Sequence, residues 1–336
     1  GIIRHPNLQA QTAHHEVFMA KKKKKHEKAA ENAGEMNVSL PTAPAKKRKR
    51  RFGDRKDGRR LRTLHPMVSM MPYIMPRRSD ACNTYADSFC IDKTDAYCRR
   101  KRKEGKPDFG ILYVIIAAYV RTISQRPVIN RFVSGQKIYA QNHISVLMVI
   151  KREMSLDAPD TSIKVFFEPT DTIDDVYEKF NKAIRENAKL NEKNKFDKYA
   201  KAFSLIPGLL LRWTMKFINF LDYFGWLPRA LLDISPMHAS MIITSMGSLG
   251  IKPIYHHIYD FGNLPVFLAY GTKRTEHTLD KNGNIVTHKY VDLKAVTDER
   301  ICDGYYYASA FKMFKRFVEN PELLERPPEE VYEDID

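Results

Sequence analysis

A charged turn near the C-terminus, residues 297–305 (TDERICDGY), holds the side chains of this sequence best placed to carry chemistry. The turn would present its charged side chains where a strand passes into a helix, and junctions of this kind often carry chemistry. The Asp303-Gly304 pair closes the turn. An ordinary Asp-Gly turn, with Asp303 near the start of a helix, is the alternative interpretation.

The elements that must position this turn can be predicted from the flanking residues. A β-branched run at 290–296 feeds the turn as a strand, and the Lys/Phe periodicity of 306–318 leaves it as a helix. Asn282-Gly283 predicts a hairpin that ends in the 290–296 strand. Further strands are expected at 85–92, 162–167, 240–245 and 266–273, and a hairpin at 136–139 and 143–152. Helices are expected at 110–125, after Thr172, and in a short segment that ends at Arg102 and is capped by Asp92 or Thr94. This order predicts an α+β sheet with largely antiparallel pairing.

The composition is that of a globular protein with a basic N-terminal segment. The chain has 336 residues, is 43% hydrophobic and carries a net charge of +16. Residues 1–60 hold 17 basic and 6 acidic side chains, a net of +11, and we expect them to be a disordered tail. Such a tail could bind polyanions or a membrane surface, or it could simply increase solubility. Four cysteines without a CxxC pair favour a reducing, cytoplasmic location.

Residues 200–234 form the most apolar stretch, yet Arg212, Lys216, Asp222 and Arg229 interrupt it. These charges argue against a transmembrane span and favour a pair of amphipathic helices. The pattern leaves three interpretations open: helices packed into the core, a pocket for an acyl chain, or a surface that lies on a membrane.

Several familiar motifs are absent from the sequence. There is no Walker A motif, GxGxxG, GxSxG or HExxH, and the eleven histidines lack paired metal-ligand spacing, so we expect no metal site. His256 and His257 are adjacent, and in a strand they would point to opposite faces. One of them could reach a site, and a structural role is the alternative for both.

Three segments resemble the coenzyme A-dependent acyltransferases, namely chloramphenicol acetyltransferase and the catalytic domain of dihydrolipoyl acyltransferases from 2-oxoacid dehydrogenase complexes. Residues 300–305 with the following helix and 319–321 are similar to the C-terminal His-x-x-x-Asp-Gly signature of that family. Residues 243–250 (ITSMGSLG) and 266–271 resemble its strand, glycine turn and next strand. Arg77-Arg78, the apolar helix and residues 126–132 form the third match. The resemblance covers about 61–320, apart from an apolar helical insertion at 192–234, and leaves 321–336 as an acidic tail.

The resemblance implies a two-layer sandwich of the chloramphenicol acetyltransferase type, with a mixed, largely antiparallel sheet flanked by helices. It also implies a homotrimer with active sites between subunits and coenzyme A as a substrate. By position, Asp303 would be the structural acid paired with Arg77 or Arg78. Thr244 or Ser245 would supply the hydroxyl that stabilises the oxyanion.

Glu299 stands where the family pattern has its catalytic histidine. A glutamate with a reference pKa of about 4.3 is a weaker base than an imidazole at about 6.5, a difference worth roughly 3 kcal/mol. Three hypotheses follow. Burial could raise the basicity of Glu299, His256 or His257 could supply the base, or the protein could keep the fold and bind without turnover.

The function expected from the sequence is that of a standalone acyltransferase, which moves an acyl group between coenzyme A and a hydroxyl, amine or thiol acceptor. No lipoyl domain or lipoyl group is expected on this chain, so it is not expected to form the core of a dehydrogenase complex. The alternative is a catalytically silent binding or scaffold protein. We expect a cytoplasmic location, with polyanion or membrane-surface contact through the basic tail and residues 200–234 as a further option.

Overall fold

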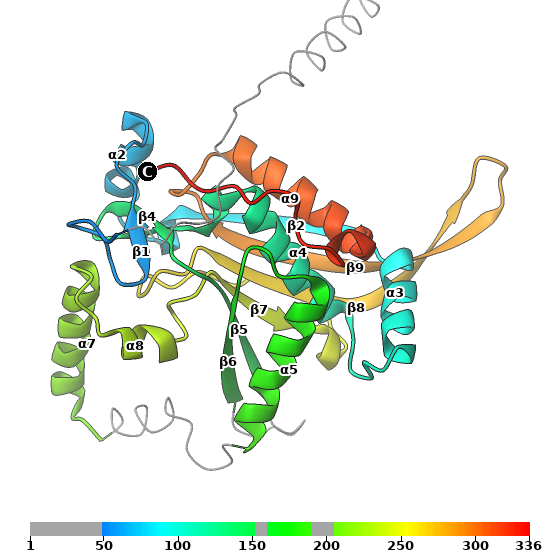
Figure 1. Cartoon of the computed structure of the whole chain (residues 1–336), viewed down its shortest axis with the longest axis horizontal. Helices are drawn as coiled ribbons and strands as arrows, with labels where there is room; N and C mark the ends of the chain where they lie inside the picture. The colour runs from blue at the N-terminus through cyan, green and yellow to red at the C-terminus, as the bar shows by residue number, and fades with distance from the viewer. Residues whose placement is uncertain (1–48, 152–159, 190–204) are drawn as a thin grey trace, which may run out of the picture. The chain divides into compact units, whose positions relative to one another are not determined.

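The computed structural model describes residues 49–151, 160–189 and 205–336, which all belong to one compact unit (Figure 1). Most of the predicted basic tail therefore lies outside the described residues. Gly58–Arg60, however, form strand β1 inside the segment that we expected to be disordered. Strand β1 forms because its backbone pairs with strand β4 (Lys137–Gln141), which lies much further along the chain.

A six-stranded mixed sheet is the centre of the fold, with the order β2-β9-β8-β7-β5-β6. Its strands are β2 (Cys82–Cys90), β5 (Ile144–Lys151), β6 (Asp160–Phe167), β7 (Met241–Ser245), β8 (Val266–Leu279) and β9 (Ile285–Asp298). The β5–β7 and β7–β8 pairs are parallel, and the other three pairs are antiparallel. The predicted mixed, largely antiparallel sheet is confirmed.

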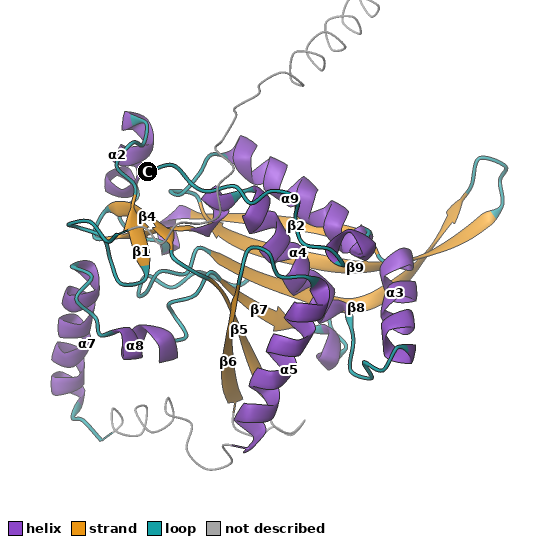
Figure 2. Ribbon diagram, viewed as in Figure 1, coloured by secondary structure: helices purple, strands orange, loops and turns teal. Residues whose placement is uncertain are grey.

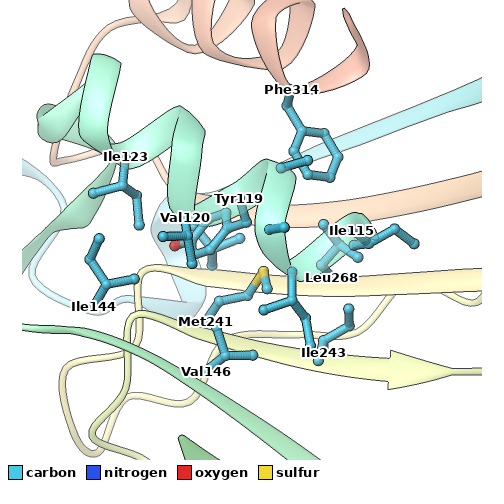
Figure 3. Packing of buried hydrophobic residues seen from close by; sticks show 14 of the residues in the cluster. Ile115, Tyr119, Val120, Ile123, Ile144, Val146, Met241, Ile243, Leu268 and Phe314 are labelled. Atoms are coloured by element: carbon cyan, nitrogen blue, oxygen red, sulfur yellow. The ribbon is translucent and has the colours of Figure 1, made fainter. Parts of the chain in front are cut away.

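Strand alternation builds the core on one face of this sheet. Alternate residues of four strands point to that face and are buried there: 241 and 243 of β7, 291, 293 and 295 of β9, 144, 146 and 148 of β5, and 266, 268 and 270 of β8. Figure 3 shows Ile115, Tyr119 and Val120 of helix α4 against Met241 and Ile243 of β7. A smaller buried cluster on the opposite face contains Ile242, Ile258 and Phe267.

The helices that cover the core face are α3 (Asp92–Lys103), α4 (Ile111–Gln125), α5 (Ile173–Lys189) and α9 (Gly304–Glu319) (Figure 2). Helix α4 is long and almost entirely buried, as its apolar run predicts. Thr172 caps α5, since its hydroxyl oxygen accepts a hydrogen bond from the backbone N–H of Asp175 at 3.2 Å. The remaining helical elements are α2 (Pro66–Ile74), α7 (Gly208–Tyr223), α8 (Arg229–Ile234) and the short 3₁₀ turns at Ser79–Ala81, Pro127–Asn130, Gly247–Leu249 and Pro321–Leu324.

A second, three-stranded sheet corrects one prediction. It has the order β1-β4-β3, where β3 spans Arg131–Ser134 and β4 spans Lys137–Gln141. We expected residues 136–139 and 143–152 to pair as a hairpin, but β4 pairs with β3 and β1, while β5 pairs with β6 and β7. The tight turn is instead at Gly135-Gln136, where both residues have positive φ.

The apolar stretch 200–234 is helical where it is described, but α7 does not enter the core. Asp222 is the single buried residue of α7. The interpretation of these helices as core elements is therefore wrong for α7. None of the described helices has the length and apolar character needed to span a bilayer.

Candidate functional site

A buried ion-pair network lies at the start of the charged turn. Asp298, the last residue of β9, has no exposed surface, and its carboxylate lies between two buried guanidinium groups. Arg300 donates to it from Nε at 2.8 Å and from a terminal nitrogen at 2.7 Å. Arg78 donates from Nε at 3.3 Å. One carboxylate therefore joins the end of β9, the turn and the segment before β2.

The sheet register explains why these groups meet. Strand β2 pairs with β9 so that Cys82 is opposite Asp298, which places the residues just before β2 beside the end of β9. The other guanidinium nitrogens of Arg78 donate to the carbonyl oxygens of Val133 at 2.8 Å and Tyr259 at 2.9 Å. Burial lowers the pKa of Arg78, and the charge of Asp298 opposes that shift. Each of the three guanidinium nitrogens of Arg78 therefore donates to a protein acceptor.

Asp303 does not take part in this network, which corrects the expected ion pair with Arg77 or Arg78. Asp303 is exposed and caps α9, because its carboxylate accepts a hydrogen bond from the backbone N–H of Tyr306 at 2.8 Å. Arg77 is exposed as well. Within the described part of the chain the structural acid that Arg78 contacts is Asp298. The physical reason is that Asp298 is still part of a buried strand, whereas Asp303 starts a helix on the surface.

Glu299 lies between the two buried charges, but its own side chain is exposed. Its backbone N–H donates to the carbonyl oxygen of Ala81 at 2.8 Å, so the main chain at this position is fixed. No described residue donates a hydrogen bond to its carboxylate. Within a single chain, Glu299 is therefore held in place by its backbone while its carboxylate faces outwards.

Thr244 and Ser245 end strand β7 and point to opposite faces of the sheet. Burial raises the pKa of Tyr270 on the core face, and a hydrogen bond with the side chain of Ser245 lowers it. Ser245 therefore belongs to the core face. Thr244 shares the other face with Ile242 and is half-buried there.

The register of the sheet also separates Thr244 from Glu299. Thr244 is level with Ala269 on β8, which in turn is level with Lys294 on β9. Glu299 is five residue steps from Lys294, a distance of about 17 Å along the strand direction at about 3.4 Å per residue. Within one chain these two residues therefore do not share a site.

His256 and His257 lie in the segment between β7 and β8, which is not a strand, so strand alternation does not apply to them. The ring of His256 stacks on Phe267 with centroids 4.1 Å apart. Its Nε2 atom is buried without a hydrogen-bond partner among the described residues. Burial lowers the pKa of His256, and the neighbouring charge of His257 lowers it further. Phe267 is level with Val296, so the ring is about 10 Å along the strand from Glu299.

One group of side chains among the described residues has the donors and the spacing to hold a metal ion: Cys90, Asp92 and His288. The carboxylate of Asp92 accepts from Nδ1 of His288 at 2.7 Å and from the Cys90 thiol at 3.6 Å. These hydrogen bonds already account for the closeness of the three groups. They lie at the far end of β9 from Glu299.

A polar cavity of about 30 Å³ lies between strand β5, the edge strand β6 and the segment that contains α8. Its volume suits about one water molecule. Lys164 lines it and donates to the carbonyl oxygens of Leu232 at 2.8 Å and Ser235 at 3.2 Å. Burial lowers the pKa of Lys164 to about 8. This cavity is too small for coenzyme A.

The acidic C-terminal segment supports the charged turn, which the sequence did not indicate. The carboxylate of Asp334 accepts from Arg131 at 2.6 Å and 2.5 Å, and both side chains are buried. Arg131 also donates to the carbonyl oxygen of Ile301 at 3.3 Å. The segment predicted as an acidic tail is thus connected to the turn through one guanidinium group. A pairing between residues so far apart in sequence leaves no local signal.

Comparison with known proteins finds a family match for the C-terminal part. Residues 236–325 match the family model for the 2-oxoacid dehydrogenases acyltransferase (catalytic domain). This segment contains Thr244, the histidine pair and the charged turn. The resemblance inferred from the sequence motifs is therefore confirmed over these residues. No curated protein matches the chain.

Among solved structures, the chain is similar to a probable dihydrolipoamide acetyltransferase from Listeria monocytogenes, with 15% identity, a TM-score of 0.48 and coverage of 78% of this chain and 95% of that one. The cubic core of a pyruvate dehydrogenase multienzyme complex gives 12% identity, a TM-score of 0.45 and coverage of 85% and 99%. A chloramphenicol acetyltransferase gives 10% identity, a TM-score of 0.46 and coverage of 78% and 99%.

Proposed function

We propose that the protein transfers an acyl group between coenzyme A and a hydroxyl, amine or thiol acceptor. The observation that carries this proposal is the match of residues 236–325 to the acyltransferase catalytic-domain family. Glu299, Thr244 and the Asp303-Gly304 pair all lie within this segment. The family match supports coenzyme A as the substrate that donates or accepts the acyl group. We propose the second substrate only as a chemical class, a hydroxyl, amine or thiol compound.

In the proposed reaction Glu299 is the provisional general base. It takes the proton of the acceptor, whose oxygen, nitrogen or sulfur then attacks the thioester carbonyl carbon. The hydroxyl of Thr244 donates a hydrogen bond to the resulting oxyanion. The carbon–sulfur bond of the thioester breaks, and the proton passes from Glu299 to the departing coenzyme A sulfur. Asp298, Arg78 and Arg300 act as positioning residues that hold the turn.

The proposed site is formed by two copies of the chain. About 17 Å along the sheet separates Glu299 from Thr244 within one chain, so a joint site needs Thr244 from a neighbouring subunit. This requirement supports the homotrimer expected from the resemblance. A neighbouring subunit would also cover the exposed carboxylate of Glu299 and make it a stronger base.

A second candidate, a catalytically silent binding or scaffold protein, is favoured by one observation. The catalytic position holds a glutamate whose carboxylate is exposed in the single chain. Carboxylates are in general weaker bases than imidazoles. His256 remains the alternative base, because its buried Nε2 has no partner among the described residues.

Release of the coenzyme A thiol distinguishes these candidates. We expect the parent protein to turn over at least one acyl-CoA with a panel of acceptors, and Glu299→Gln to reduce turnover about 10²–10⁴-fold. His256→Gln serves as the control for the alternative base. No turnover in the parent, together with a gain of turnover in Glu299→His, would support the silent protein instead.

We place the protein in the cytoplasm, in contact with a membrane surface. The cysteine pattern supports the reducing compartment. Residues 205–231 and the basic sequences around them support the contact with a membrane.

A further inference from the structure

Helix α7 exposes an unusually apolar surface. Its side chains and those just after it include eight large hydrophobic residues that are about half or more exposed: Leu209, Leu210, Trp213, Phe217, Phe220, Tyr223, Phe224 and Trp226. Trp213 is 68% exposed and Phe217 is 60% exposed. Figure 1 shows no other helix or strand lying along α7. A surface of this kind marks an interaction site.

Five of these residues form one continuous stripe. Leu209, Trp213, Phe217, Phe220 and Phe224 follow one another at spacings of four, four, three and four residues, which places them on one side of a helix. At the C-terminal end the ring of Phe224 is 4.9 Å from that of Phe220 and stacks on Trp226 at 5.0 Å. The stripe therefore ends in an exposed aromatic cluster.

The opposite side of α7 is fixed to the rest of the protein at one point. At about 100° per residue, Asp222 lies opposite the stripe. Its carboxylate pairs with Arg55 at 2.6 Å and contacts Nε2 of His238 at 3.3 Å, and all three side chains are buried. Gly135 lets the backbone approach, because a Cβ atom there would lie 2.5 Å from the carbonyl oxygen of Tyr223. This anchor turns the stripe outwards.

The exposed charges of α7 are all positive. Arg212 and Lys216 flank the stripe, and neither has an ion pair with a described residue. The ammonium group of Lys216 lies 5.2 Å from the ring of Trp213, so its aliphatic stem runs beside the apolar surface. Asp222 is the one acid of the helix and is buried. The preceding residues 190–204 add four lysines against two acids.

We infer that the stripe of α7, with Arg212 and Lys216, docks the protein on a membrane that carries anionic lipids. The boundary between lipid headgroups and acyl chains favours a helix that has apolar and aromatic side chains on one side and basic residues beside them. Anionic headgroups complement the two cations. This inference develops the membrane location proposed above and is independent of acyl transfer.

Charge favours a lipid surface over a second copy of the chain. Two α7 helices packed stripe to stripe would bring Arg212 and Lys216 of both copies into the same contact. No exposed acid of the helix could neutralise them, because Asp222 is committed to Arg55 and His238. An anionic bilayer removes this repulsion and accepts the aromatic rings.

The two tryptophans of the sequence provide the test, because Trp213 and Trp226 both lie on this surface. The full chain is titrated with vesicles of phosphatidylcholine alone and of phosphatidylcholine with phosphatidylglycerol, and binding is followed by tryptophan emission and by co-sedimentation. We expect a blue shift and co-sedimentation with the anionic vesicles. We expect binding to neutral vesicles to be about 30-fold weaker, since each of the two cations contributes near an anionic surface.

Matched variants locate the contact. Leu209→Glu with Phe217→Glu should abolish the shift and co-sedimentation, whereas Leu279→Glu with Ile285→Glu, at the equally exposed tip of the β8–β9 hairpin, should not. Arg212→Gln with Lys216→Gln should weaken anionic binding about 30-fold. Lys312→Gln with Arg316→Gln, a pair of the same spacing exposed on α9, should leave it unchanged.

Three results would overturn the inference: no vesicle binding by the folded full chain, equal loss of binding in the hairpin control, or self-association without vesicle binding that Leu209→Glu with Phe217→Glu removes. The last result would identify a second copy of the chain as the occupant. Thiol release from acyl-CoA, measured without vesicles, reports the proposed reaction separately.

Discussion

At the scale of residues, Asp298 rather than Asp303 is the acid that fixes the charged turn. The resemblance predicted a structural carboxylate in the charged turn with Arg77 or Arg78 as its partner, and Arg78 does form a buried ion pair. It did not identify the acid correctly, because two carboxylates five residues apart look alike until the end of β9 is known. Burial separates them, since Asp298 has no exposed surface and Asp303 is exposed.

Replacing Asp298 by Ala should therefore lower the free energy of unfolding by about 3–5 kcal/mol, because it leaves Arg78 and Arg300 buried without their anion. Replacing Asp303 by Ala should cost only about 1 kcal/mol, the usual value of a helix cap. Urea denaturation of the two variants measures the difference. Equal losses, or a larger loss for Asp303→Ala, would contradict the assignment.

At the scale of elements, local patterns predicted most helices and strands but not all of their partners. The buried helix α4, the Thr172 cap of α5 and the Asn282-Gly283 hairpin were each specified by residues next to one another. The pairing of β4 with β1 and the contact of Arg55 with Asp222 join residues more than 75 positions apart. Such contacts depend on the whole fold. The hydrophobicity of 200–234 left core helices, an acyl-chain pocket and a membrane surface open, because composition alone does not show which side of a helix is covered.

The anchor of α7 should be sensitive to acid. Burial by itself would raise the pKa of Asp222, but the hydrogen bond from His238 and the charges of His238 and Arg55 lower it to about 2. A carboxylate whose pKa is lowered by folding stabilises the protein above its unfolded value of about 3.9, and this contribution, about 2 kcal/mol, is lost as the pH falls towards 2.

Asp222→Asn should therefore be less stable than the parent at about pH 4–5, and the difference should shrink between about pH 4 and pH 2. Urea unfolding of both proteins at a series of pH values measures this. Asp233→Asn, an exposed acid on the neighbouring helix α8, is the matched control. A difference that stays constant down to pH 2 would show that the charge of Asp222 does not hold the helix.

The C-terminal segment gives a second test at this scale. Asp334→Ala should lower the free energy of unfolding by about 3 kcal/mol, because Arg131 would remain buried without its anion. Glu329→Ala, an exposed acid of the same segment, should change it by less than about 0.5 kcal/mol. Similar small effects for both would mean that the segment is a solvated tail, as its composition suggests.

At the scale of the whole molecule, the family match groups Glu299 with Thr244, whereas the sheet register separates them. Both residues lie in the segment that matches the acyltransferase family, but the register keeps them apart within one chain. A site that forms between copies of the chain agrees with both observations. The sequence motifs could suggest this arrangement only through resemblance, because no local pattern reports the distance between two strand ends.

Mixing two inactive variants tests this central claim most directly. Glu299→Gln and Thr244→Ala are unfolded together, refolded as mixed assemblies and assayed for thiol release from acyl-CoA. Random mixing should restore about one quarter of the parent activity, because a quarter of the interfaces join an intact Glu299 to an intact Thr244 from another copy. If both residues served a site within one chain, every site would carry a defect, and the mixture would stay as inactive as its two components.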